Sequence, residues 1–136
     1  MFKLFKKLKS YKSNKEVVEP NVNVGFNTNS HYKFKLLYQN RIIGTLKYED
    51  HTWIFEYSKW FESQGYLQPL LQFPNTSLTY KSTSLWPFFE SRIPSPKQKV
   101  TKEYFAKYPK DKDNKAKLLS EFGTFSINNP YKLIGC

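Results

Sequence analysis

A strict alternation of apolar and polar residues between Tyr32 and Tyr57, broken by two short polar turns, constrains the fold of this chain most strongly. Aromatic and β-branched side chains at every second position are typical of strands that bury one face. Turns of two residues join neighbouring antiparallel strands. The sequence therefore predicts an antiparallel meander with strands over 32–38, 41–48 and 51–57 and turns at Gln39-Asn40 and Glu49-Asp50.

The second half of the chain predicts helices. Thr83 or Ser84 is suited to cap a helix that runs to Ile93, with Pro87 in its first turn and Pro94 as its stop. The remaining expected elements are a single helical turn over 59–63, a fourth strand over 67–73, helices over 100–108 and 115–122, and a short strand over 131–134. Asn114 is suited to cap the helix over 115–122, and Gly123 is suited to end it. The predicted class is α+β, a small antiparallel sheet of four to five strands with about three helices packed on it.

The chain divides into a basic N-terminal extension or linker over 1–30 and one domain over 31–136. Phe2, Phe5 and Leu8 recur at a spacing of three among lysines, which indicates a basic amphipathic helix. We favour a solvated tail over a membrane-surface helix, because so short a stretch is marginal as an independent helix. The 12 Phe, 10 Tyr and 3 Trp provide material for a single core.

The formal net charge of +11 gathers in two stretches, and residues 97–117 alone carry eight lysines against Glu103, Asp111 and Asp113. The positive electrostatic field around such stretches favours anionic partners. Lysines also alternate with aromatic residues over 32–35 and 104–112, the composition that base stacking with phosphate neutralisation requires. Single-stranded nucleic-acid binding is therefore the alternative function.

No residue set in the sequence predicts catalysis. His31 and His51 have no further histidine or cysteine ligand at metal-binding spacing, since Cys136 is the single cysteine. The five glycines are isolated, so no phosphate-binding loop is present, and the kinase motifs are missing as well. We expect no enzyme, no metal or other cofactor, and no small-molecule ligand.

Five short motifs follow one another along the chain: "GTL" at 44–46, "FEYSKWF" at 55–61, "QPLLQFP" at 68–74, "PFFESRIP" at 87–94 and "KAKLLSEFG" at 115–123. In this order the sequence resembles the HipA N-terminal subdomain family over about residues 35–123. Two segments depart from the family pattern. Residues 91–94 read Ser-Arg-Ile-Pro where Asn-Leu-Leu-Pro is common, and residues 123–129 replace a Gly-Arg-Asp-x-x-Gly-Ala segment.

In HipA toxins this subdomain precedes a serine/threonine kinase, and the present sequence ends where that kinase would begin. It resembles the stand-alone small subunit of tripartite HipBST-type systems. The resemblance implies a cytoplasmic, non-catalytic protein-interaction module of antitoxin type. Its expected partners are a separately encoded HipA-like (HipT-type) kinase, which it binds and inhibits, and a HipB-like DNA-binding protein in the same complex.

Trp86 is the expected anchor for that partner. On a helix that starts near Ser84, Leu85, Phe88 and Phe89 face the sheet, and Trp86 projects about 100° away from Leu85. Tryptophan is enriched among interface hot spots. Arg92 and Lys81 are the expected supporting cations. The alternatives are that Trp86 covers the core and that Arg92 is a solvated surface residue.

Overall fold

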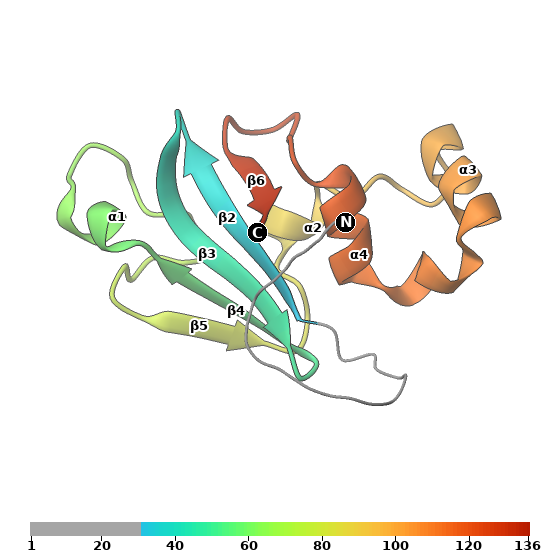
Figure 1. The fold of residues 1–136 in the computed structure, drawn as a ribbon. Coiled ribbons are helices and arrows are strands. Elements are labelled where there is room, and N and C mark those ends of the chain that lie inside the picture. The colour runs from blue at the N-terminus through green and yellow to red at the C-terminus, as the bar shows by residue number, and fades with distance from the viewer. Residues whose placement is uncertain (1–30) are drawn as a thin grey trace. The chain divides into compact units, whose positions relative to one another are not determined.

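The computed structural model describes residues 31–136, which form a five-stranded antiparallel sheet in the order β5-β4-β3-β2-β6 (Figure 1). The α+β prediction is confirmed. The strands are β2 (Tyr32–Tyr38), β3 (Arg41–Glu49), β4 (Thr52–Tyr57), β5 (Thr79–Ser82) and β6 (Lys132–Gly135). The helices are α1 (Lys59–Ser63), α2 (Pro87–Glu90), α3 (Lys99–Lys107), the 3-10 helix η2 (Pro109–Asp113) and α4 (Lys115–Phe122). The amphipathic extension expected over 1–30 lies outside the described residues.

The predicted meander is confirmed in all three of its strands. Gln39 and Asn40 have φ values of 48° and 69°, and Asp50 and His51 have values of 52° and 60°. Two-residue turns with both central residues in this left-handed region match the twist of the strands they join. The second turn lies one residue later than predicted, because Glu49 still pairs with Thr52.

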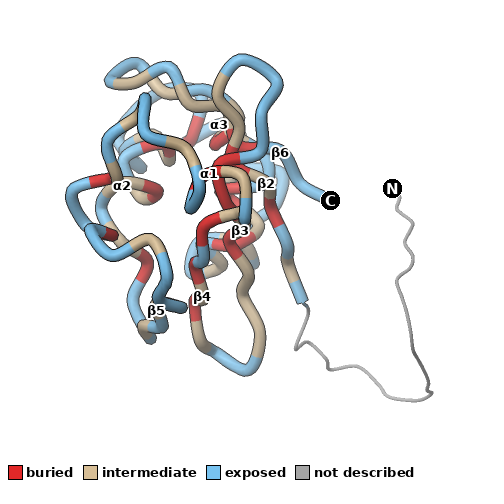
Figure 2. Tube along the Cα trace, turned by 90° about the vertical axis from the view of Figure 1, so that its left-hand side faces the viewer, coloured by how far each residue is buried: buried red, intermediate tan, exposed pale blue. Residues whose placement is uncertain are grey.

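The two faces of the sheet differ in character because side chains alternate along each strand. One row runs Phe34–Leu46–Phe55–Tyr80 across β2, β3, β4 and β5, and its first three members are fully buried. The neighbouring row on the opposite face runs Lys33–Lys47–Ile54–Lys81. Figure 2 shows the resulting alternation of buried and more exposed positions along the strands. We call the two sides the core face and the outer face.

The prediction of a strand over 67–73 is wrong, because this segment is a loop. The loop does contribute Leu70 and Phe73 to the core. Pro69 and Pro74 remove two backbone donors that a ladder would need. The segment is instead held by the Tyr57 hydroxyl, which donates to the Phe73 carbonyl (2.6 Å) and accepts from the Leu70 N–H (2.9 Å). The place beside β4 belongs to β5.

The helix expected from Ser84 is also shorter than predicted. It begins at Pro87 and covers four residues, with Trp86 at the N-cap in an extended conformation (φ −69°, ψ 146°). A residue before proline avoids the helical region, so Pro87 sets the start of the helix rather than sitting inside it. Leu85 and Phe89 are buried and Phe88 is half-buried, so the assignment of these three side chains to the core holds.

The two longer helices lie where the sequence predicts them. Asn114 caps α4 by accepting from the Lys117 N–H at 3.0 Å. On α3, however, Val100 is exposed and Thr101 is the buried residue, so the apolar side chains of this helix pack only in part. The last strand, β6, pairs with β2 as expected. None of the helices between residues 31 and 136 has the length and apolarity needed to cross a membrane.

Candidate partner-binding surface

Trp86 lies at the start of α2 with one side against the core and the other partly exposed. Its ring meets Phe73 edge-on, with the ring centroids 4.9 Å apart. The side chain is half-buried, and its indole N–H finds no hydrogen-bond acceptor among the described residues. Trp86 therefore covers the core and remains partly exposed at the surface.

The loop before β5 exposes further apolar side chains. Leu71 is 97% exposed and Tyr66 is 91% exposed. The loop is fixed by side chains at its start, where Gln64 accepts from the Tyr66 and Leu67 N–H groups at 2.8 Å each. At its other end, the Gln72 side chain accepts from the Phe88 N–H at 2.9 Å, and Phe73 packs on Trp86. Leu71 thus projects from a braced segment directly beside the start of α2.

Lys81 does not share this surface with Trp86. In the β4–β5 ladder Lys81 lies opposite Ile54, whereas Tyr80 lies opposite Phe55. Directly opposed residues point to the same face, so Tyr80 is on the core face and Lys81 is on the outer face. Trp86 packs on Phe73, which also contacts Phe55, and so belongs to the core face. The expected grouping of Lys81 with Trp86 is therefore not formed within the domain.

Arg92 departs furthest from its prediction, because it is buried and only 5% exposed. One guanidinium nitrogen donates to the carbonyls of Gly123 (3.0 Å) and Thr124 (3.3 Å). The other donates to the Asn129 side chain (3.1 Å) and the Tyr131 carbonyl (2.9 Å). Arg92 thus binds the loop between α4 and β6 and does not offer its charge to a partner.

Within residues 31–136, the environment of Arg92 contains dipoles but no carboxylate in ion-pair contact. Burial lowers the pKa of its guanidinium to about 10, and the Nε atom has no acceptor in the part of the chain that the structure describes. The side chain still carries its charge at neutral pH, and it lies over the Phe88 ring at 5.6 Å. One signal in the sequence pointed to this burial: Arg92 occupies a position that the family pattern fills with leucine.

The aromatic and basic residues of the nucleic-acid alternative separate in space. Phe34 is buried on the core face, whereas Lys33 and Lys35 are on the outer face. Tyr104 is likewise engaged, since its hydroxyl donates to Asp111 at 2.6 Å. Of that second stretch, Tyr108 is the exposed ring. Rings and ammonium groups therefore do not combine into a stacking surface, and this arrangement does not favour single-stranded nucleic-acid binding.

Two further features complete the surface of residues 31–136. Within this range no group of three His, Cys, Asp or Glu side chains is arranged to hold a metal ion. A groove of about 450 Å³ opens between α3 and the turn that follows α2. Sequence reasoning missed this groove, because its walls come from segments that are distant in the chain.

Residues 34–127 match the sequence profile of the family described as "HipA N-terminal domain". A solved structure described as "N-terminal domain of HipA toxin" is similar, with a TM-score of 0.52 and 18% sequence identity. That match covers 77% of this chain and 92% of the other chain, and at this identity it shows the fold alone. No curated protein matches the sequence.

Proposed function

The chain belongs to the HipA N-terminal domain family, and from this premise we propose that it binds and inhibits a HipA-like serine/threonine kinase encoded as a separate chain. Membership of this family points to a protein-interaction role related to toxin–antitoxin systems, and the family's domain is not the catalytic kinase domain. In the proposal, the chain acts in the cytoplasm as an antitoxin-type subunit, and a HipB-like DNA-binding protein joins the same complex.

The surface around Trp86 is the proposed docking site for the kinase. The observation that carries this assignment is the exposure of Leu71 on a loop that hydrogen bonds hold in place. Scattered exposed leucines are ordinary in monomeric proteins, but Leu71 precedes Gln72 and Phe73, which contact the Phe88 N–H and the half-buried Trp86. A braced surface also loses little conformational entropy on binding.

Two of the residues first expected at this site take other roles in the proposal. Arg92 supports the domain from within, because its donors are already used. Lys81 belongs to the outer face of the sheet and contacts the kinase only if the partner reaches around the β5 edge. The proposed contact residues are therefore Trp86 and Leu71.

Leu71→Asp provides the sharpest test. Burial of a leucine side chain in an interface contributes about 1.5–3 kcal/mol, and an aspartate there must be desolvated as well. We expect the affinity for the purified kinase, measured by isothermal titration calorimetry, to fall at least roughly tenfold. The thermal melt should stay the same, because Leu71 is 97% exposed and makes no core contact.

Ile127→Asp is the matched control, since Ile127 is 100% exposed on a different loop. It changes the same property without touching the Trp86 surface. Unchanged binding of the Leu71→Asp variant would remove the loop from the interface. Equal losses in the two variants would show that neither position is specific, and an undetectable interaction of the unmodified chain with the kinase would overturn the proposed function itself.

A further inference from the structure

The groove between α3 and α2 has an apolar floor and a size suited to a ligand. Its volume is about 450 Å³, within the range of roughly 300–1,000 Å³ that is usual for binding pockets. The floor is formed by Ile93, Pro94, Pro96, Phe105 and Leu118. These side chains offer no charge and few hydrogen-bonding groups, so the floor suits an apolar side chain.

Hydrogen bonds hold the far wall of the groove in position. Thr101, at the start of α3, is buried and donates from its hydroxyl to the Ser95 carbonyl at 2.7 Å. Tyr104 donates to Asp111 at 2.6 Å and packs edge-on against Phe122 of α4, with centroids 5.4 Å apart. The groove is therefore built into the fold, because α3 is tied to both the proline turn and the following helices.

The lining of the groove is itself balanced in charge, because Glu90 and Asp113 offset Lys112 and Lys115, and the positive excess comes from the lysines beside it on α3. Glu90 and Lys115 form an ion pair at the rim and neutralise one another. Lys112 also lines the rim, and Lys102 lies one turn before Phe105 on α3, where residues three apart are neighbours. Among the described residues, neither Lys102 nor Lys112 has a carboxylate within ion-pair distance.

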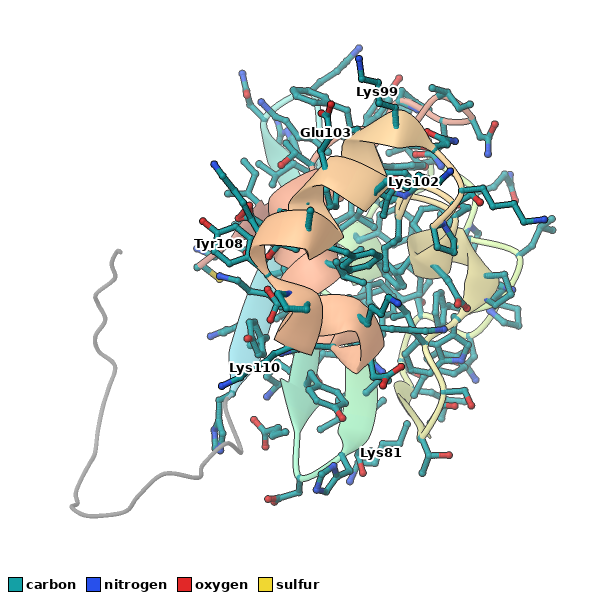
Figure 3. The ribbon with its side chains drawn as sticks, turned by 90° about the vertical axis from the view of Figure 1, so that its right-hand side faces the viewer. Lys81, Lys99, Lys102, Glu103, Tyr108 and Lys110 are labelled. Atoms are coloured by element: carbon teal, nitrogen blue, oxygen red, sulfur yellow. The ribbon has the colours of Figure 1, made fainter. Side chains whose placement is uncertain are left out.

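The excess extends along the whole α3 side of the domain. Figure 3 shows Lys99, Lys102 and Lys110 on α3 and the turn after it. Residues 97–117 carry eight lysines against three acidic residues, of which Glu103 pairs with Lys99, Asp111 accepts from Tyr104 and Asp113 lines the groove. The field around the groove is thus positive, and an incoming segment with carboxylates is attracted to it.

We infer that this groove is a peptide-binding site for a short acidic segment that carries apolar side chains. The apolar part fills the floor, and flanking carboxylates meet Lys102 and Lys112 at the rim. A nucleic-acid strand fits less well, because its bases would find few polar partners on this floor. The site begins at the end of α2 opposite Trp86, so it is additional to the proposed kinase surface and does not depend on it.

Binding of a fluorescein-labelled peptide, Gly-Glu-Asp-Leu-Phe-Asp-Glu-Gly, to the full chain tests the inference by fluorescence anisotropy. Replacing Leu-Phe in the peptide by Ser-Ser should weaken binding about tenfold or more, because the floor then gains no apolar contact. The double variant Lys102→Glu with Lys112→Glu should weaken binding of the original peptide by a similar factor. Both lysines are exposed, so the variant should fold normally.

The control is Lys33→Glu with Lys81→Glu on the outer face, which changes the net charge by the same amount at two exposed positions. It should alter affinity by less than about threefold. The lysines of residues 1–20 are unchanged in all variants and cannot produce a difference between them.

Chemical shifts of backbone amides should move at Ile93, Phe105 and Leu118 when the peptide binds. The site is refuted if both double variants lose affinity equally, since binding would then reflect net charge alone. It is refuted as well if the Ser-Ser peptide binds as tightly as the original, or if a duplex oligonucleotide displaces the peptide at lower concentration than unlabelled peptide does. None of these outcomes involves the kinase, so a failure of this inference can be distinguished from a failure of the proposed function.

Discussion

Arg92→Met distinguishes a buried structural arginine from a surface arginine that waits for a partner. Methionine keeps most of the length of the side chain but removes the guanidinium and its four hydrogen bonds. Hydrogen bonds from a charged donor contribute about 1.5–3 kcal/mol each when one partner is lost. Part of this loss is recovered, because water reaches the half-buried acceptors at Thr124 and Tyr131 and because the burial of an unpaired charge is relieved.

We therefore expect a net destabilisation of about 2–4 kcal/mol, the range of substitutions that break a buried polar network. For a domain of this size the thermal midpoint should fall by roughly 10–20 °C. Circular dichroism melts of the full chain measure this directly. Arg92→Lys should lose less, because an ammonium group satisfies some of the acceptors but does not span both pairs.

Arg41→Met is the appropriate control, since Arg41 is exposed and lies over the Trp60 ring at 4.8 Å. It should shift the midpoint by no more than a few degrees. The structural role of Arg92 is refuted if Arg92→Met melts within about 2 °C of the unmodified chain. If Arg92→Met melted normally and no longer bound the kinase, the surface role expected from the sequence would be correct.

Three further predictions concern the framework. Burial raises the pKa of Tyr57 to about 12, so the native state holds this proton more tightly than the unfolded chain, and the corresponding stability is intact below pH 10 and lost between pH 10 and 12. Tyr57→Phe should lower the free energy of unfolding by about 1–2 kcal/mol at pH 7 and flatten this alkaline decline in urea titrations. Asn114→Ala should cost about 1 kcal/mol in the same assay, through loss of the α4 cap, and Ser120→Ala should not. Gly44→Ala should cost about 2 kcal/mol or more, because its Cβ would lie 2.6 Å from the Glu56 carbonyl oxygen; a melt unchanged by this substitution would contradict the packing described for β3 and β4.

The parts of the fold that could be predicted have their cause in neighbouring residues. The meander follows from side-chain alternation and two-residue turns, and α4 follows from Asn114 and Gly123 at its ends. Such signals act within a few positions, so they can be recognised without knowing the partner of each strand. The one-residue error in the second turn arises because Asp and His both adopt the left-handed conformation there.

The errors occur where a distant segment decides the outcome. Residues 67–73 have the composition of a strand, but Tyr57, ten or more positions earlier, captures the backbone groups at Leu70 and Phe73. The sequence leaves Trp86 with a core role and a partner role as alternatives; its contact with Phe73 supports the core role, and the partner role stays a prediction. The groove depends on α3 folding back near Ser95, which no local pattern specifies.

The two departures from the family pattern are, in this fold, a single structural feature. Arg92 stands where leucine is common, and it donates to Gly123, Thr124 and Asn129, which all belong to the segment that replaces Gly-Arg-Asp-x-x-Gly-Ala. An arginine at this buried position needs carbonyl and amide acceptors around it, and the altered segment supplies them. Conversely, the altered segment has no arginine of its own, so its carbonyls depend on the donor from residue 92.

Each change would be costly alone, because it would leave a buried donor or acceptor without its partner. Restoring leucine at position 92 alone should therefore destabilise this chain, although leucine is the residue that the family pattern favours.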